Sequence, residues 1–471
     1  MLTMGIGYGA RSRVVLLGPQ GRTRTSDWSS VNERVPERPP HCALVAFYFP
    51  PARASGVFRA RALANHLAAS GWRVTVLTTQ TGFFEDVLQQ ADRGLLDAID
   101  PGVEIVRVPF PDPRFDRRLR FHGWFRGNFP RWAERRMERC AQRRFPDPYA
   151  LWIDPAVSAL RARHEQMPID VLVASGNPFS SFEIVREVSQ RTAVPYVLDY
   201  RDAWTLDQFT ETEAYPHGSP VWDAERQTIE AAARVVYVNA TQKEWYAERY
   251  PSSQRRMAVI ENGFDPELLG ATGDVKPAGA ALRFGYVGTI TRHLPWSELV
   301  AGWRLVRDRP ELQEAEIDLF GHLGFFSHSK DGIAALLPSD ENTERVNYRG
   351  PLPKGQVGDA YRALDVLLLV TPSSRYVTCQ KVYEYMAFGK PIVSINQPQT
   401  DARTPLRGYP LSFAVDDLEP EQVAEALLAA AAAARAPDAD AVQASKDHAA
   451  HFTRERRMAE FETLLEEVVD G

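Results

Sequence analysis

Lysine, cysteine and long apolar stretches are all scarce in this sequence. Seven lysines accompany 48 arginines among its 471 residues, and the first lysine is Lys243. The three cysteines, Cys42, Cys140 and Cys379, are far apart, which suits a reducing compartment and excludes a disulfide framework or a cysteine zinc site. No run of about 18 apolar residues occurs, so no segment is expected to cross a bilayer. The net charge of −6 argues against a general nucleic-acid binder.

The remaining composition is that of a globular chain with more than one core. Hydrophobic residues make up 44% of the sequence and charged residues 25%, which excludes wholesale disorder. Because a domain usually takes about 100–200 residues, the length predicts two or three domains. Residues 1–40 mix six arginines with glycine, serine and proline, so we expect them to form a flexible tail.

Short apolar runs alternate with helical segments from residue 42 onward. Residues 43–49 predict a strand buried on both faces, residues 57–69 a helix that ends before Gly71, and residues 73–78 a second strand. A strand–helix–strand unit of this length predicts an α/β fold with a parallel sheet. Further strands are predicted at 103–108, 171–174, 196–199 and 235–239.

A second series of strands follows a stretch rich in glycine, proline and alanine at 270–280. These strands are predicted at 283–287, 315–320, 346–348, 366–370, 391–395 and 411–414, with helices at 420–435 and 453–469. We therefore predict two tandem Rossmann-like, doubly wound domains that face a cleft, at 41–268 and 282–450, joined by a linker at 269–281 and followed by a last segment at 451–471. Ligands of open α/β sheets bind beyond the carboxyl ends of the strands, so two such sheets predict a bisubstrate site.

Two segments of the second domain carry candidate anion-binding residues. Gly288, Thr289 and Arg292 lie in a turn between a predicted strand and helix, where glycine allows close backbone approach and arginine attracts an anion. The alternative is an ordinary turn with a surface arginine. Lys381 and Glu384 lie three residues apart on one helix face, where the first can meet phosphate and the second two ribose hydroxyls. The alternative there is a solvated ion pair.

The first domain places polar residues after two of its predicted strands. Asp202 can act as a base or position a hydroxyl, and Arg201 can hold an anion; the alternative is a buried Asp–Arg pair that caps loops. Asn177 and Ser180 would face the same site, although helix capping by Ser180 is an equal explanation.

Residues 107–144 contain twelve arginines and four acids, interleaved with tryptophan and phenylalanine. This region is a candidate surface for a phosphate-bearing acceptor or an anionic membrane, or else a solvated helical excursion. No histidine or carboxylate spacing indicates a metal site, and the one Asp-x-Asp match, at 438–440, lies in a connector rich in alanine and proline.

Six stretches together resemble a known family. They are FYFPP at 47–51 with Gly56, FPDPYALW at 145–152, DYRDAWT at 199–205, ENGFD at 261–265, YVGT at 286–289 and KVYEY at 381–385. In this order they are similar to glycosyltransferases of the GT-B fold, close to the retaining GT4 group of bacterial enzymes for cell-surface polysaccharides and secondary metabolites. The similarity covers about residues 42–470.

The resemblance implies a glycosyltransferase that moves a sugar from a nucleotide-diphosphate sugar to a hydroxyl of a glycan, a lipid-linked saccharide or a small metabolite, with retention and without a metal or other cofactor. The residues implied in donor binding are Gly56, Gly288, Thr289, Arg292, Gly321, Thr378, Lys381 and Glu384. Those expected at the acceptor are Asn177, Ser180, Arg201 and Asp202, and those expected in catalysis are Asp202, Arg292 and Lys381.

The last helix would pack back on the first domain. We expect a cytoplasmic location, with peripheral contact at the inner membrane face through residues 107–144.

The sequence departs from the family pattern at two places. Many members carry a glutamate eight positions before Glu384, where this chain has Tyr376, and a lysine after the turn at Gly288, for which Arg292 is the substitute. Two alternatives therefore stay open. One is a nucleotide-sugar epimerase of the same fold, and the other is a catalytically silent relative that acts as a binding partner.

Overall fold

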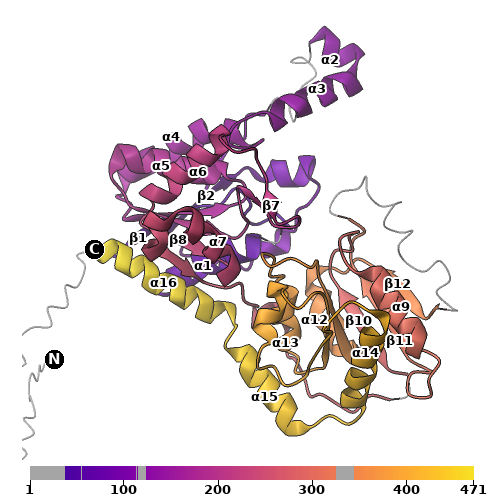
Figure 1. Cartoon of the computed structure of the whole chain (residues 1–471). Helices are drawn as coiled ribbons and strands as arrows, with labels where there is room; N and C mark the ends of the chain where they lie inside the picture. The colour runs from indigo at the N-terminus through magenta and orange to yellow at the C-terminus, as the bar shows by residue number, and fades with distance from the viewer. Residues whose placement is uncertain (1–37, 55, 113, 115–122, 280, 325–343) are drawn as a thin grey trace, which may run out of the picture. The chain divides into compact units, whose positions relative to one another are not determined.

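The computed structural model of the chain describes residues 38–54, 56–112, 114, 123–279, 281–324 and 344–471. Of the predicted tail at 1–40, only residues 38–40 fall within this part. Figure 1 draws the helices and strands with the labels used below.

A seven-stranded parallel sheet occupies the first half of the chain, in the order β3-β2-β1-β4-β5-β8-β9. Its strands are β1 (His41–Val45), β2 (Arg73–Thr79), β3 (Val103–Val108), β4 (Val171–Gly176), β5 (Tyr196–Tyr200), β8 (Arg234–Tyr237) and β9 (Met257–Val259). The helices between them include α1 (Val57–Ala69), α4 (Ile153–Gln166), α5 (Ser180–Thr192), α6 (Pro220–Ala231) and α7 (Ala240–Arg249). The order 3-2-1-4-5 at its start is that of a doubly wound nucleotide-binding fold.

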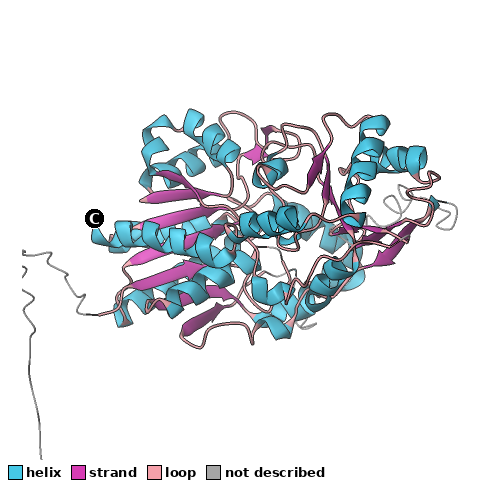
Figure 2. Ribbon diagram, turned by 90° about the horizontal axis from the view of Figure 1, so that it is seen from below, coloured by secondary structure: helices cyan, strands magenta, loops and turns pink. Residues whose placement is uncertain are grey.

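A six-stranded parallel sheet occupies the second half, in the order β12-β11-β10-β13-β14-β15. Its strands are β10 (Arg283–Val287), β11 (Glu316–Phe320), β12 (Val346–Gly350), β13 (Val366–Val370), β14 (Ile392–Ile395) and β15 (Ser412–Ala414). Its helices include α9 (Trp296–Val306), α12 (Val357–Ala363), α13 (Lys381–Met386), α14 (Pro420–Arg435) and α15 (Ala439–Ala450). Buried clusters cover both faces of each sheet, and Figure 2 shows helices on either side of the strands. The predicted fold class of two Rossmann-like halves is confirmed.

Three local predictions differ from the structure. The first strand ends at Val45 rather than residue 49, because Phe47 leaves the sheet to pack its ring against Phe110 and Trp152. The strand predicted at 235–239 ends at Tyr237, and Asn239 instead caps α7. Strand β9 and the short hairpin of β6 (Leu206–Asp207) and β7 (Thr212–Glu213) were not predicted.

The last helix, α16 (Arg454–Asp470), packs against the first sheet. Met458, Phe461 and Leu465 join the buried cluster that includes β1 and α1, and the Glu462 carboxylate accepts a hydrogen bond from Trp72 Nε1 at 3.0 Å. The residues just before α16 lie beside Phe264, where the chain leaves the first half. The Phe264 N–H donates to the carbonyl of residue 452, and the backbone carbonyl of Phe264 accepts from the N–H of residue 454.

Candidate functional site

Two glycine turns lie at the carboxyl ends of β10 and β11. Gly288 and Gly321 have φ values of +157° and +150°, which side chains rarely adopt. The turns also touch, because a Cβ at Gly321 would lie 1.8 Å from the Gly288 carbonyl oxygen. The Gly288 N–H donates to the carbonyl of Phe320 at 2.8 Å. Only glycine at residue 321 fits this approach, which leaves a surface of bare backbone at the sheet edge.

Lys381 begins α13 and places its ammonium against the first of these turns. A Cβ on Gly288 would lie 2.3 Å from Lys381 Nζ. The ammonium donates to Tyr286 Oη at 2.6 Å and lies 3.9 Å from the centre of that ring, while the tyrosine hydroxyl donates to the Thr289 carbonyl at 2.8 Å. The structure thus brings together Gly288, Thr289 and Lys381, as the sequence analysis predicted.

Glu384 lies one helical turn further along α13 and is buried, with 6% of its surface exposed. Its carboxylate accepts a hydrogen bond from Tyr361 Oη at 2.8 Å and one from the Gln380 amide at 3.1 Å. Glu384 and Lys381 therefore do not form the solvated ion pair of the alternative, because Glu384 is buried and Lys381 contacts the phenol of Tyr286. Whether Glu384 binds ribose stays a prediction.

Arg292 follows the same β10 turn and is exposed, four residues before α9 begins at Trp296. No hydrogen bond or ion pair joins it to another of the residues that the structure describes. The neighbouring His293 ring stacks on Phe209 of the first half, with ring centres 6.1 Å apart. Arg292 is therefore a solvated cation near the point where the two halves touch.

Thr378 and Tyr376 lie in a loop that contacts the first half. The Asn239 amide, from the turn before α7, donates to the Tyr376 carbonyl at 3.1 Å and to Thr378 Oγ1 at 3.3 Å. Thr378 in turn donates to Asp401, whose pKa burial raises to about 7. The Tyr376 side chain is buried and lies beneath the Arg375 guanidinium, 5.2 Å from the ring centre. At position 376, where the family pattern has a glutamate, this chain has a tyrosine whose backbone carbonyl joins the two halves.

In the first half, four predicted residues meet near the start of α1. A Cβ at Gly56 would lie 2.2 Å from Cζ of Arg201, so a side chain at residue 56 would displace this guanidinium. Arg201 donates to the Asn177 carbonyl at 2.7 Å and pairs with Asp202 at 3.2 Å. The Asp–Arg pair of the alternative is therefore present, but it is not buried as that alternative predicted. The Asp202 side chain is 40% exposed and retains access to solvent.

Ser180 is completely buried, and its hydroxyl donates to Asp147 at 2.6 Å. The backbone N–H of Ser180 donates to the other oxygen of the same carboxylate at 2.8 Å. The alternative that Ser180 caps a helix is wrong, because Ser180 is the first residue of α5 and the capping carboxylate comes from Asp147. Burial is the main cause that raises the pKa of Asp147.

Sequence analysis missed a buried ion pair beneath these residues. Arg59, from α1, donates through Nε to both carboxylate oxygens of Asp199 at 3.0 Å, and through Nη1 to the Glu261 carbonyl at 3.0 Å. Two arginines, Arg59 and Arg61, among the apolar residues that α1 buries were the available signal.

The described residues offer neither a metal site nor a membrane-spanning helix. No three His, Cys, Asp or Glu side chains gather there as metal ligands, and Asp438 of the Asp-x-Asp match caps α15. Among the helices of that part, none combines the length and apolar character that a membrane crossing needs.

Comparisons with known proteins agree with this architecture. The family model described as a glycosyl transferase 4-like domain matches residues 55–263. Sucrose-phosphate synthase from Thermosynechococcus elongatus is 17% identical with a TM-score of 0.63, over 91% of this chain and 99% of that chain. HepE from Anabaena, in complex with UDP, is 12% identical with a TM-score of 0.60, over 91% and 100% of the two chains. A search of the curated proteins gave no match.

The similarity extends to a third solved structure. The α,α-trehalose 6-phosphate synthase from Burkholderia multivorans is 14% identical with a TM-score of 0.60, over 92% of this chain and 99% of that chain. At such identities the neighbours establish the fold, and the family model adds the activity class for the first half. With its two parallel sheets the chain has the GT-B fold of these neighbours, and its first half matches the glycosyl transferase 4-like domain over residues 55–263, as the motifs predicted.

Proposed function

We propose that the protein moves a sugar from a nucleotide-diphosphate sugar, held by the second half, to a hydroxyl of an acceptor held by the first half. The observation that carries this proposal is the lysine ammonium of Lys381 against the backbone of Gly288, with the buried carboxylate of Glu384 one turn away. Among the neighbours, HepE has been solved with UDP-glucose and a trehalose-6-phosphate protein from E. coli with UDP-2-fluoro glucose, which supports a donor of this class.

The reaction needs positive charge where the diphosphate leaves. In the transition state the sugar gains oxocarbenium character and the departing phosphate gains negative charge, so a preorganised cation stabilises it more than the ground state. In our proposal Lys381 and Arg292 supply this charge, each on the scale of about 2.7–4 kcal/mol for one electrostatic donor. The bare backbone of Gly288 and Gly321 lets the phosphates approach closely.

The remaining residues would bind and orient the two substrates. Glu384 would accept the ribose hydroxyls, while Thr378 holds the loop beside it. At the acceptor, Asp202 would orient the hydroxyl group and Arg201 would fix Asp202 in place. We propose retention, with the leaving phosphate as the group that receives the acceptor proton, and no requirement for a metal or further cofactor.

The test begins with a thermal-shift panel of nucleotide sugars on the wild-type protein. A donor present at 100 times its Kd should stabilise the folded state by about 2.7 kcal/mol. The donor found in this way is then titrated against Glu384→Ala, Glu384→Gln and the control Glu425→Ala, which removes an exposed glutamate of the same half. We expect both Glu384 variants to lose donor affinity and the control to keep it. Unchanged affinity and turnover in Glu384→Ala would contradict the site.

The substitution at Tyr376 supports a second candidate function, a silent relative that binds the donor without transferring its sugar. Such a protein would be stabilised by a nucleotide sugar but release no nucleotide with any acceptor. A nucleotide-sugar epimerase would instead convert the donor with no acceptor present. Product analysis with and without acceptor separates these outcomes from sugar transfer.

A further inference from the structure

Two helices of the first half, α2 (Trp124–Asn128) and α3 (Pro130–Gln142), expose an unusual amount of aromatic surface. We call residues 124–143 the arm. Trp124 is 67% exposed, Phe129 52% and Trp132 47%. Of the seven large hydrophobic side chains that are exposed in the described residues, four lie between positions 124 and 145. Clusters of exposed apolar side chains mark interaction sites in soluble proteins, whereas scattered ones do not.

The arm also carries a strong positive charge. Arg131, Arg135, Arg136, Arg139 and Arg143 are all exposed, and the exposed acids of the arm are Glu134 and Glu138. Glu138 is paired with Arg114, so the five exposed arginines exceed the remaining acid by four charges. Small residues, Ala133 and Ala141, form the buried side of α3. Arginine and aromatic side chains therefore share the solvent side, and the Arg136 guanidinium lies 5.4 Å from the centre of the Trp132 ring.

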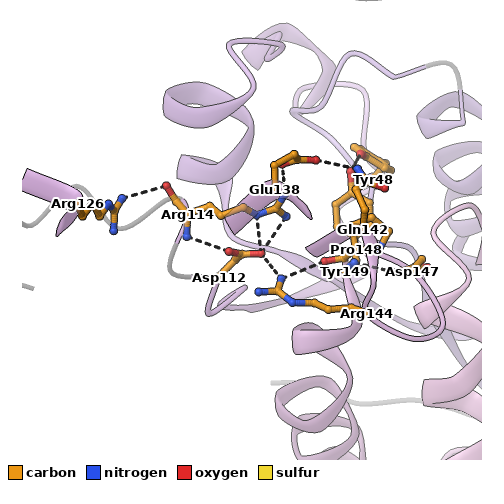
Figure 3. Close-up of polar contacts among 10 residues, drawn as sticks. All are labelled: Tyr48, Asp112, Arg114, Arg126, Glu138, Gln142, Arg144, Asp147, Pro148 and Tyr149. Atoms are coloured by element: carbon orange, nitrogen blue, oxygen red, sulfur yellow. Dashed lines mark hydrogen bonds and ion pairs between the residues drawn. The ribbon is translucent and has the colours of Figure 1, made fainter. Parts of the chain in front are cut away.

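Ion pairs hold the base of the arm in place (Figure 3). The Asp112 carboxylate is fully buried and accepts hydrogen bonds from Arg114 at 2.9 Å and from Arg144 at 2.5 Å, residues on the two sides of the arm in sequence. Burial would raise the pKa of Asp112, but the hydrogen bonds from the two arginines hold it below its ordinary value. An ionised Asp112 thus joins the segment before the arm to the segment after it. These ion pairs fix the base of the arm to the first half.

The same base contacts the side of the sheet where we place the acceptor. Arg144 donates to the carbonyl of Pro148 at 3.4 Å, and the next residue, Tyr149, shares a hydrogen bond of 2.6 Å with Tyr48, which follows β1. Asp147 of this segment holds the start of α5 through Ser180. The base of the arm therefore lies near the residues that follow β1 and β4.

We propose that the arm docks on an anionic lipid bilayer and so brings the first half to a lipid-linked acceptor. Tryptophan and phenylalanine beside arginines are the composition that favours the interface of a membrane, where rings enter the headgroup layer and cations meet phosphates. Neither signal alone gives stable binding, and here both lie on one element. The part of this inference that concerns the acceptor rests on the proposed function, whereas the docking itself does not.

The first experiment measures co-sedimentation of the full chain with vesicles, without any sugar donor. Vesicles of phosphatidylcholine alone are compared with vesicles that contain about one third phosphatidylglycerol. We expect binding to the anionic vesicles only, weakened by salt, since each arginine near the surface contributes about fivefold in partitioning. Equal binding to both vesicles, or to neither, would overturn the proposal. Because no sugar is present, a failure of the proposed function leaves this result unaffected.

Matched variants locate the binding surface. The triple variant Arg131→Gln, Arg135→Gln, Arg139→Gln should lose about 100-fold in vesicle binding. The control Arg255→Gln, Arg309→Gln, Arg456→Gln changes the same charge at exposed positions elsewhere and should bind as wild type. Trp132→Ala should weaken binding, unlike Leu305→Ala, a second exposed hydrophobic residue. Equal losses in arm and control variants, or wild-type binding by Trp132→Ala, would indicate a general polyanion effect and overturn the proposal.

Turnover on a water-soluble acceptor then separates docking from catalysis. The arm variants are expected to keep wild-type turnover there and to lose activity only on an acceptor carried in anionic vesicles. Loss on both acceptors would show that the arm supports the catalytic fold and does not deliver the enzyme to a membrane.

Discussion

The two halves differ in how the charged side chains at the carboxyl ends of their strands are paired. In the first half the charged residues neutralise each other, as Arg201 does with Asp202 and Arg59 with Asp199. In the second half Lys381 contacts a phenol, and no carboxylate among the described residues pairs with it or with Arg292. A surplus of positive charge suits an anionic diphosphate, whereas a balanced surface suits a neutral hydroxyl acceptor. Both sheets share one fold, and the balance of charge at these residues differs between them.

The largest expected effect comes from removing the charge of Lys381. In Lys381→Ala we expect kcat/KM to fall about 100- to 1000-fold, because the departing diphosphate loses its ammonium partner. The measurement is nucleotide release with the donor that the thermal-shift panel selects, and the control is Lys446→Ala, whose ammonium only contacts the Gly273 carbonyl. Wild-type kcat/KM in Lys381→Ala would show that the unpaired positive charge of the second half plays no part in the reaction.

The glycine turn should be the next most sensitive feature. In Gly321→Ala the new methyl meets the Gly288 carbonyl and the backbone has a positive φ, so we expect a loss of about 3 kcal/mol in the free energy of unfolding together with loss of donor binding. Urea denaturation measures it. Gly355→Ala is the control, because nothing lies within 4 Å of its Cβ position. An equal free energy of unfolding in both variants would contradict this, because it would show that the Gly288 and Gly321 turns can move apart at little cost.

A buried carboxyl of the first half allows a test by pH. Glu225 accepts hydrogen bonds from Thr205 Oγ1 at 2.5 Å, Tyr246 Oη at 3.0 Å and Tyr250 Oη at 2.9 Å. Burial raises its pKa from 4.5 to about 7. The unfolded chain therefore releases this proton first as pH rises, so the contribution of Glu225 to the free energy of unfolding is fully present below pH 4.5 and falls by about 3 kcal/mol by pH 7.

The variant Glu225→Gln should remove this loss, because an amide does not ionise. Urea denaturation at pH 5 and pH 8 compares it with wild type and with Glu230→Gln, which changes an exposed residue of the same helix. We expect a flatter pH dependence in Glu225→Gln alone. The same slope in all three proteins would place the ionisation elsewhere in the molecule.

The smallest effect on stability is expected at Asp202. Because the side chain is 40% exposed, breaking its pair with Arg201 in Asp202→Asn should change the free energy of unfolding by less than about 1 kcal/mol. The acceptor KM should nevertheless rise, while donor affinity stays as in wild type. Asp223→Asn, another exposed partner of an arginine, is the control. An unchanged acceptor KM would leave Asp202 as a bridge between loops.

The sequence predicted the order of elements well, because burial on both faces gives parallel strands a continuous apolar pattern. Strands 103–108, 283–287 and 366–370 and helix 57–69 end where the pattern ends. Residues 46–49 show the limit of this reasoning, since an apolar run does not reveal where strand pairing stops and ring packing begins. The pattern could not distinguish a buried loop from a strand.

The site was predicted less completely, because contacts distant in sequence determine it. Lys381 and Glu384 were visible as a helical pair, but their partners Tyr286 and Tyr361 were not. The capping carboxylate of α5 comes from Asp147, 33 residues before Ser180. Propensity and spacing describe neighbours along the chain, and these contacts arise only after the elements pack.

The position of α16 has a consequence for the order of synthesis. Its 17 residues complete the core beside β1 and α1, although the chain has by then built the entire second sheet. The first half is consequently discontinuous in sequence, and its hydrophobic face stays uncovered until α16 has been synthesised. A fragment that stops after the linker would lack that cover, so the two halves are not separable by cutting the chain once.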